Sequence, residues 1–257
     1  MFPQIQVYNL PKFADPGDLA DGTVVVIDVL RASTTIIYAL QAGAKAILPC
    51  REVGDARSIA RQYPCDEIIL GGERGGVQIK GFDLGNSPEE YTPDMIRGKT
   101  VIFTTTNGTQ ALFHAKKAKQ ILIGAFVNAS AIMQKLLGEK VIHLLCAGTR
   151  GQATEEDILF AGMLTEKLQR QGGVKCKRND QAIAACDLWR HTLDITQASA
   201  AEPPKPEQLA ETLRNSLGGK NLVSLGLERD ILAAAQIDRF AVIPEYNPKT
   251  SCIQVVK

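Results

Sequence analysis

An acid and a base directly follow the most apolar strand that the sequence predicts. Residues 24–27 are three valines and an isoleucine, and Asp28, Arg31 and the hydroxyl residues 33–35 come next. A carboxylate can bind Mg²⁺, and a guanidinium can bind a doubly charged oxyanion. Because ligands of open α/β folds bind beyond the carboxyl ends of strands, Asp28 and Arg31 indicate a metal or phosphate site. A local ion pair, with Asp28 capping the next helix, is the structural alternative.

Two more apolar strands end in polar loops. Residues 101–103 lead into Thr-Thr-Thr-Asn-Gly-Thr at 104–109, and residues 141–145 lead into Cys-Ala-Gly-Thr-Arg-Gly at 146–151. The acidic run 155–157 follows the second loop. The first loop opens a predicted helix, whose N-terminal amides and dipole favour anions, although a plain helix cap explains it equally well. If the three strands share a sheet, the loops can face one crevice.

A glycine-rich segment separates the first two of these loops. Residues 71–88 carry Glu73, Arg74, Asp83 and Asn86 among closely spaced glycines. This density of glycine excludes a helix, so the sequence predicts a long ordered loop. Such a loop can bring backbone amides close to a ligand, and a solvated surface loop is the alternative.

The composition excludes several classes of protein. The chain has 257 residues, 45% of them hydrophobic and 5% aromatic, with a net charge of +1. Nucleic acid is not the expected partner because backbone binding needs clustered Lys and Arg. No apolar run reaches the roughly 20 residues of a membrane span, and the start lacks the pattern of a signal peptide. We therefore expect a cytoplasmic protein without a membrane partner; a homo-oligomer is compatible with the sequence.

The alternation of apolar strands and helices predicts an α/β fold. We expect a three-layer arrangement of β-α-β units around a mixed, largely parallel sheet, in a single domain of residues 1–257. Residues 174–257 are the hardest part to interpret. Residues 23–48 and 100–122 both follow a strand, loop, helix, strand order, which an internal duplication would explain. The predicted strands cover residues 23–29, 46–48, 68–70, 100–104, 120–123, 141–145, 240–243 and 251–256, with an edge strand within 1–20. The predicted helices cover residues 32–42, 53–62, 107–116, 129–138, 154–170, 180–195, 207–216 and 228–235, and Gly218-Gly219 is expected to turn the chain.

The common covalent routes of phosphate chemistry lack their motifs. A cysteine phosphatase built on Cys146 would need an arginine where Gln152 stands, and an aspartyl-phosphate hydrolase would need a second Asp where Leu30 stands. The phosphate-binding loop G-x-x-x-x-G-K-[S/T] is also absent from the sequence. A metal-activated water is then the simplest route for hydrolysis.

Four motifs together resemble the 2-phosphosulfolactate phosphatase family. They lie at residues 26–35, 72–88, 105–109 and 146–157, in the order of that family. The resemblance implies a Mg²⁺-dependent phosphatase with an α/β fold. It would hydrolyse the phosphate ester of (R)-2-phospho-3-sulfolactate, or a related 2-phospho-carboxylate, to 3-sulfolactate and phosphate. In archaeal methanogens that step belongs to coenzyme M biosynthesis.

The resemblance and the residues together suggest a role for each candidate. We expect Asp28, Arg31, Glu156 and Asp157 to take part in catalysis, with Glu156 or Asp157 accepting the proton of the water. The expected Mg²⁺ ligands are Asp28 first, then Glu73, Asp83 and Asp157. The expected substrate-binding residues are Arg31, Arg74, Asn86, Asn107, Gly108 and Thr109.

Two other interpretations fit some of the same residues. Asp28 and Cys146, each following a strand, resemble the pair of a cysteine hydrolase of the isochorismatase type, in which an Asp and a Lys activate the thiol. The lysine is unclear here because Lys99 precedes its strand. A non-catalytic anion-binding module could use the same loops.

Overall fold

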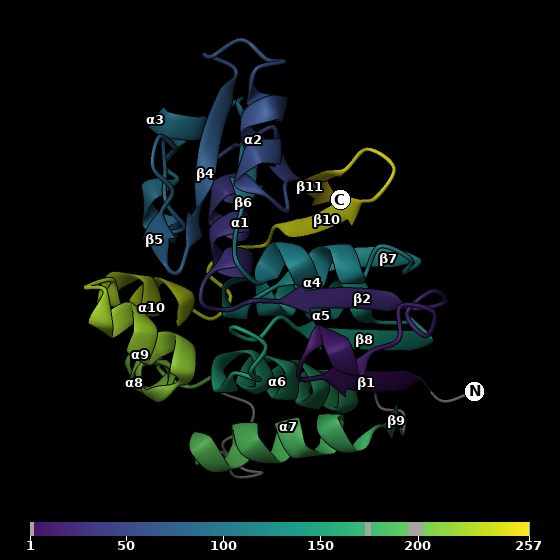
Figure 1. The fold of residues 1–257 in the computed structure, drawn as a ribbon. Helices are drawn as coiled ribbons and strands as arrows, with labels where there is room; N and C mark the ends of the chain where they lie inside the picture. Colours follow the sequence, from purple (N-terminus) through teal and green to yellow (C-terminus); the bar gives the residue numbers. More distant parts are fainter. Residues whose placement is uncertain (1–2, 173–175, 195–202, 257) are drawn as a thin grey trace.

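Short apolar strands and amphipathic helices alternate along the chain and build a single large sheet between helices (Figure 1). The computed structural model describes residues 3–172, 176–194 and 203–256. The strands are β1 (Gln4–Tyr8), β2 (Thr23–Ile27), β3 (Ala46–Pro49), β4 (Ile68–Arg74), β5 (Val77–Gln78), β6 (Thr100–Thr104), β7 (Gln120–Gly124), β8 (Val141–Cys146), β9 (Lys177–Arg178), β10 (Ile243–Asn247) and β11 (Cys252–Val256). The helices are α1 (Ala32–Gln41), α2 (Val53–Ala60), α3 (Pro93–Ile96), α4 (Gly108–His114), α5 (Ala129–Leu136), α6 (Glu155–Gly172), α7 (Asp180–Thr192), α8 (Pro206–Asn215), α9 (Leu217–Ser224) and α10 (Glu228–Ala234), with 3-10 turns η1 (Pro11–Phe13), η2 (Pro88–Glu90) and η3 (Phe126–Asn128).

The sheet consists of two parallel groups of strands. Its order is β5-β4-β6-β3-β11-β10-β7-β2-β8-β1-β9. Strands β4, β6 and β3 are mutually parallel, as are β7, β2, β8, β1 and β9. The hairpin β10–β11 joins the groups, with β10 antiparallel to β7 and β11 antiparallel to β3, so the two groups run in opposite directions. This confirms the mixed, largely parallel sheet, and it gives the C-terminal part of the chain a place in the middle of it.

The two strand-helix-strand units expected from the sequence share this sheet. In the first unit β2 leads through α1 to β3, and in the second β6 leads through α4 to β7. The second strand of each unit pairs with the first strand of the other, β3 with β6 and β7 with β2. An ancestral duplication remains a prediction, as does the single domain.

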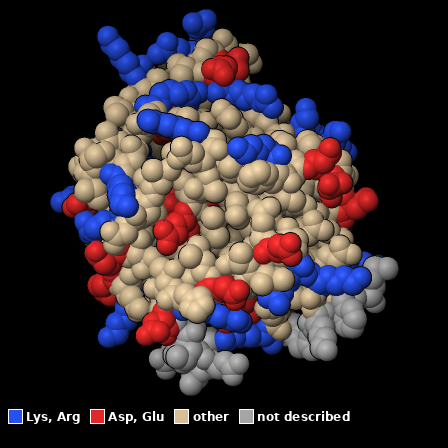
Figure 2. Space-filling model, turned by 60° about the horizontal axis from the view of Figure 1, so that its bottom comes forward, with Lys and Arg blue, Asp and Glu red and all other residues tan. Residues whose placement is uncertain are grey.

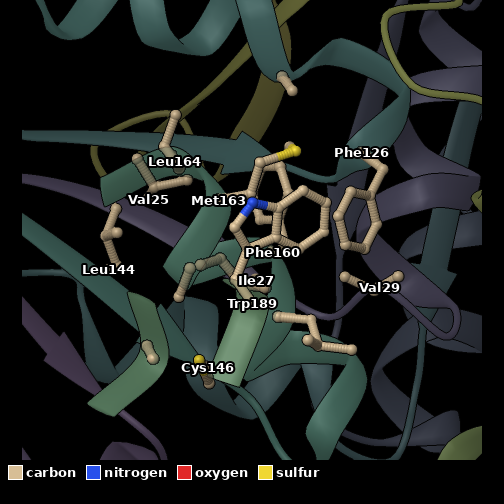
Figure 3. Packing of buried hydrophobic residues seen from close by; sticks show 14 of the residues in the cluster. Val25, Ile27, Val29, Phe126, Leu144, Cys146, Phe160, Met163, Leu164 and Trp189 are labelled. Atoms are coloured by element: carbon tan, nitrogen blue, oxygen red, sulfur yellow. The ribbon is translucent and has the colours of Figure 1, made fainter. Parts of the chain in front are cut away.

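Alternate residues of β2 pack on opposite faces of the sheet. Val24 and Val26 belong to a cluster with residues of α1 and α4, whereas Val25 and Ile27 belong to one with α5, α6 and α7. Figure 3 shows the second cluster, where Phe160 and Trp189 lie close to Phe126. Burial on both faces explains why β2 is apolar without alternation, and each such side chain stabilises the fold by about 1.5–3 kcal/mol.

The glycine-rich segment begins as a strand, where a loop was expected. Strand β4 continues through Gly71 and Gly72 to Arg74, and β5 pairs back onto it. Glycine is required here because a Cβ on Gly71 would collide with the Tyr91 hydroxyl, and one on Gly72 with the carbonyl of Thr104. The missing side chains allow strand β6 and the Tyr91 ring to approach closely, which the composition of the segment did not reveal.

The C-terminal third departs from the prediction in three places. Strand β10 covers Ile243–Asn247 instead of residues 240–243. Gly218 and Gly219 lie inside α9 instead of turning the chain, because Ser216 caps this helix by accepting a hydrogen bond from the Gly219 amide. Helix α7 ends at Thr192, and residue 195 of the predicted helix lies outside the described residues.

Strand β1 was expected at an edge, but the two-residue β9 pairs with its first two residues on the outer side. Within the described ranges, no helix is both long enough and apolar enough to cross a membrane. On the face in Figure 2, Lys and Arg side chains are interspersed with Asp, Glu and uncharged surface. That nucleic acid is not a partner remains a prediction.

Candidate active site

A pocket lies where the carboxyl ends of β2, β4, β6 and β8 converge. Its volume is about 50 Å³. Helix α9, from the C-terminal part of the chain, forms another wall. The lining residues are Asp28, Leu30, Arg31, Glu73, Gly75, Gly76, Asn86, Thr106, Asn107, Thr149, Arg150, Gly218, Asn221 and Leu222. The polar loops after three strands and the glycine-rich segment therefore meet at a single site, as the strand-end rule predicts.

Asp28 is the acid at the centre of this site, and it is 8% exposed. Its Oδ1 accepts a hydrogen bond from the Ala32 amide at 3.2 Å, while Oδ2 accepts none from the described residues. A Cβ on Gly108 would lie 2.7 Å from that Oδ2, so glycine at this position leaves room for it. Asp28 thus directs one carboxylate oxygen toward the start of α4.

Burial raises the pKa of Asp28 from its ordinary value of 3.8 to about 7. The charges of Glu73 and Glu156 raise it further, whereas the Ala32 hydrogen bond and the charge of Arg31 lower it. The ionised form of Asp28 is therefore unfavourable in the protein alone, and a cation beside it would remove this penalty.

Glu73 lies on β4 and lines the pocket, whereas its neighbour Arg74 lies outside it. Glu73 Oε1 accepts a hydrogen bond from the Thr106 amide at 2.7 Å, and Oε2 accepts one from the Gly76 amide at 2.6 Å. The Arg74 guanidinium donates to the carbonyls of Glu73 and Arg51 and to the Thr104 hydroxyl. Successive residues of a strand point to opposite faces, which separates this pair.

Asp83, the other acid of the glycine-rich segment, is exposed and does not line the pocket. Its Oδ2 accepts a hydrogen bond from the Leu70 amide at 2.8 Å, which fixes the segment against the start of β4. Asn86 does line the pocket. It is 5% exposed, and its Oδ1 is buried without a hydrogen-bond partner among the described residues. An oxygen buried in this way needs a partner, which a water, an ion or a substrate group would supply.

The loop after β6 provides the expected polar rim. Asn107 lines the pocket, and its Oδ1 accepts a hydrogen bond from the Arg150 amide at 3.1 Å. Gly108 is buried against Asp28. The amide of Thr109 is already engaged because it donates to the Thr105 hydroxyl at 3.3 Å. Of the expected anion donors in this loop, Asn107 is the one that reaches the pocket.

Glu156 and Asp157 lie behind Asp28 and do not line the pocket. They are 1% and 2% exposed. Asp157 Oδ1 accepts from the Val29 amide at 2.8 Å and Oδ2 from the Gly148 amide at 3.0 Å, so this carboxylate ties the β2 and β8 loops together. Burial raises the pKa of both acids, and their mutual repulsion adds to the effect on Asp157. Glu156 Oε2 is buried without a partner among the described residues.

Arg31, at the start of α1, is held by residues that sequence reasoning missed. Its guanidinium pairs with Asp230 of α10 at 2.5 Å and donates to the Gly76 carbonyl at 2.7 Å. Arg150 is a second missed residue, although its place in a polar loop after β8 was a usable signal. Asp230 and Asn221 carried no signal, because they lie on C-terminal helices without a recognisable motif.

The buried oxygens fit a small hard cation. Among the described residues, no group of three or more His, Cys, Asp and Glu side chains is arranged to hold a metal ion. Mg²⁺ does not require such a group, since it is usually bound by one or two carboxylates, substrate oxygens and waters. Asp28 and the orphaned amide oxygen of Asn86 both line the pocket and offer ligands of this type.

Cys146 is not placed to act as a nucleophile. The side chain is fully buried in the apolar cluster that contains Ile27 and Phe160 (Figure 3). Burial raises the pKa of its thiol well above the ordinary value, and the charges of Asp157 and Glu156 raise it further. A reactive cysteine needs a thiolate and access to its substrate, so the isochorismatase-like interpretation is wrong for this residue.

Known proteins resemble the chain along almost its whole length. A family model described as 2-phosphosulpholactate phosphatase matches residues 8–249. A protein of Caldanaerobacter subterraneus subsp. tengcongensis named probable 2-phosphosulfolactate phosphatase is 34% identical over 242 residues, 94% of each chain. Proteins with the same name from Symbiobacterium thermophilum and Parasynechococcus marenigrum are each 36% identical, over 231 and 244 residues. The matches cover 90% and 94% of this chain and 93% and 95% of theirs.

The fold, the strand-end pocket and these matches define an α/β enzyme that hydrolyses phosphoric monoesters. The chain belongs to the 2-phosphosulpholactate phosphatase family. A small phosphoester is therefore its substrate, and the alternative of a non-catalytic anion-binding module is set aside.

Proposed function

We propose that this enzyme hydrolyses the phosphate ester of (R)-2-phospho-3-sulfolactate in a Mg²⁺-dependent reaction, releasing 3-sulfolactate and phosphate. The names of the relatives support the substrate. The observation that carries the proposal is the pocket whose wall holds the buried acids Asp28 and Glu73 together with the buried Arg31. Carboxylates can bind a divalent ion, and a guanidinium can bind a phosphate group that contacts the same ion.

Asp28 and Asn86 would hold the Mg²⁺ ion. Asp28 Oδ2 and Asn86 Oδ1 are side-chain oxygens of the pocket walls that accept no hydrogen bond from the described residues. When bound, the ion would polarise a phosphoryl oxygen and lower the pKa of a coordinated water. Asp157 would keep Asp28 in place by fixing the following residue, Val29, through its amide.

Arg31 would orient the phosphate group. A guanidinium has five N–H donors, and the structure uses one on Asp230 and one on Gly76. The three that remain can donate to phosphoryl oxygens from the wall of the pocket. In phosphoryl transfer most of the catalysis comes from such positioning and charge stabilisation.

Glu73 would accept the proton of the attacking water. It is the second acid of the pocket wall, and the Gly76 and Thr106 amides fix both of its oxygens. Glu156 and Asp157, which the sequence suggested for this role, lie behind the pocket wall. Glu73 keeps an acceptor site because each carboxylate oxygen has two lone pairs.

A substrate with more than one negative charge fits the surroundings of the pocket. Arg150 lines it, and among the described residues no acid forms an ion pair with this side chain. A second cavity of about 420 Å³ shares Asn107 with the pocket, and its lining includes Lys12 and Arg51 together with the acid Glu52. A carboxylate or sulfonate next to the phosphate would meet the cationic side chains of Arg150, Lys12 and Arg51.

Release of phosphate from a substrate panel tests the proposal. The purified protein is assayed with phosphosulfolactate, phospholactate and p-nitrophenyl phosphate, each in Mg²⁺ and in excess chelator. We expect hydrolysis of phosphosulfolactate that stops on chelation and returns when Mg²⁺ is added back. Turnover that survives complete chelation would refute the metal-dependent route. Faster turnover of phospholactate than of phosphosulfolactate would show that the preferred substrate is not the sulfonated compound.

We extend the proposal to the setting of the reaction. The product 3-sulfolactate would be used in coenzyme M biosynthesis. The enzyme itself would be cytoplasmic. Assembly into a homo-oligomer is part of the same proposal. The intracellular location of a tagged chain and its molar mass in solution, measured by light scattering, test these two statements.

A further inference from the structure

A buried ion pair links the pocket to the C-terminal helices. Arg31 Nη1 lies 2.5 Å from Asp230 Oδ2, and both side chains are 4% exposed. Asp230 belongs to α10, which in Figure 1 lies with α8 and α9 at one side of the sheet. The two residues are 199 positions apart in the sequence, so only the tertiary structure brings them together.

Asp230 is itself fixed from a second direction. The Ser87 hydroxyl, at the end of the glycine-rich segment, lies 2.7 Å from both Asp230 oxygens and donates to this carboxylate. The Gly76 carbonyl accepts from the other terminal nitrogen of Arg31. Two of the three nitrogens are thus held by different segments, which fixes the plane of the guanidinium and leaves its other donors for the pocket.

Stability alone does not account for this pair. Removing two charges from water is costly, and apolar replacements of a buried ion pair are often as stable or more stable. Asp28 is a second acid on the wall of the same pocket, and its Oδ2 accepts no hydrogen bond from the described residues. Without Asp230, the guanidinium would be attracted to Asp28, because a buried charge without a partner is costly and both Glu73 oxygens already accept backbone amides.

We propose that Asp230 is a positioning residue, which holds the Arg31 guanidinium for the phosphate group and keeps it from pairing with Asp28. Asp230 acts through Arg31 and does not touch the substrate. Its loss therefore affects two properties at once, the binding of the phosphoester and the Mg²⁺ requirement. This inference rests on the proposed function, in which Arg31 binds the phosphate and Asp28 binds the ion.

A double-mutant cycle on the intact enzyme tests it. The wild type, Asp230→Asn, Arg31→Ala and the double variant are compared with phosphosulfolactate over a series of Mg²⁺ concentrations. We expect Asp230→Asn to lower kcat/KM by roughly 10- to 100-fold, the size of effect that misplacement of a reactive group produces. The Mg²⁺ concentration for half-maximal rate should rise at least about threefold, because Arg31 now competes for Asp28.

The Arg31→Ala background separates positioning from a structural role. If Asp230 acts through Arg31, Asp230→Asn should change kcat/KM less than about twofold there, since coupled residues are non-additive. An equal fall in both backgrounds would overturn the proposal, as would an unchanged Mg²⁺ requirement. Glu228→Gln is the matched control, because this acid lies on the same helix in an exposed ion pair with Arg214. It should leave both parameters unchanged.

A further variant, Ser87→Ala, and a binding measurement with inorganic phosphate complete the test. Ser87→Ala removes one anchor of Asp230 without leaving a buried charge unpaired, so it should fold even where Asp230→Asn does not. It should shift kcat/KM and the Mg²⁺ requirement in the same direction by a smaller factor, and no shift would contradict the proposal. Inorganic phosphate provides a second readout, since the rise in Tm that it causes should shrink in Asp230→Asn and not in Glu228→Gln. If the wild type hydrolyses no phosphoester, the proposed function fails. The rise in Tm caused by inorganic phosphate, compared between the wild type and the variants, still tests the role of Asp230.

Discussion

Replacing Asp28 by asparagine should stabilise the metal-free protein at neutral and alkaline pH. Burial raises the pKa of Asp28 from 3.8 to about 7. A raised pKa in the folded state means that the contribution of this acid to stability is complete below pH 4. It is then lost as the pH rises through about 7. Asparagine keeps an acceptor oxygen for the Ala32 amide and carries no charge, so it avoids this loss.

The size of the effect follows from the pKa difference. About 3 pKa units at about 1.4 kcal/mol each give an upper value of about 4 kcal/mol at pH 8. Repulsion by the charges of Glu73 and Glu156 is part of this value, and relaxation of these side chains in the wild type reduces it. We therefore expect about 1–2 kcal/mol, or a Tm higher by roughly 2–8 °C for a chain of this size.

Thermal unfolding in excess chelator measures this difference. The Tm of Asp28→Asn should exceed that of the wild type at pH 8, and the gap should close by about pH 4.5. In Mg²⁺ the order should reverse, because the wild type gains the binding energy of the ion and the variant does not. Glu228→Gln, an exposed acid, serves as the control without a pH-dependent gap. The reasoning is falsified if the wild type and Asp28→Asn keep the same Tm at every pH in chelator.

Three further substitutions test other parts of the site. Glu73→Gln should lower kcat by about 100-fold or more while Mg²⁺ still raises the Tm, as expected for a proton acceptor; loss of the Mg²⁺ effect would instead make Glu73 a ligand. Arg150→Gln should raise KM for phosphosulfolactate about tenfold and leave p-nitrophenyl phosphate nearly unaffected, and an equal change for both would exclude recognition of the second anion. Cys146→Ala should retain activity within about twofold and lose about 1–2 kcal/mol of unfolding free energy from a small cavity; inactivity of a folded variant would reopen a role for the thiol.

The centre of the site could be predicted because local sequence carried the signal. Asp28 follows a strand that is apolar on both faces, and Asn107 follows another, so the strand-end rule identified both residues. Their strands run in opposite directions, so the shape of the sheet is what brings the two ends together. The glycine-rich segment was correctly joined to this site, but its conformation was not predicted. Strand β4 runs through Gly71 and Gly72 because Tyr91 and Thr104 take the space of their side chains, and that contact is not visible in composition.

Which acids face the pocket was a question of side-chain direction, which loop position cannot answer. Glu73 lines the pocket and Arg74 does not, because alternate residues of a strand point to opposite faces. Glu156 and Asp157 follow a polar loop as expected, yet they point behind Asp28, where Asp157 accepts two backbone amides. The sequence identified the acids, and the packing of α6 against the sheet decided which of them face the pocket.

The sequence by itself determined the family, the α/β class and the strand ends that carry Asp28 and Asn107, because periodicity and motifs are local properties of the chain. Only the tertiary structure decided that α9 completes the pocket and that Asp230 of α10 holds Arg31. These contacts join residues about 200 positions apart. These contacts form because the apolar faces of the C-terminal helices become buried. Such packing leaves no recognisable sequence pattern around a polar residue such as Asp230.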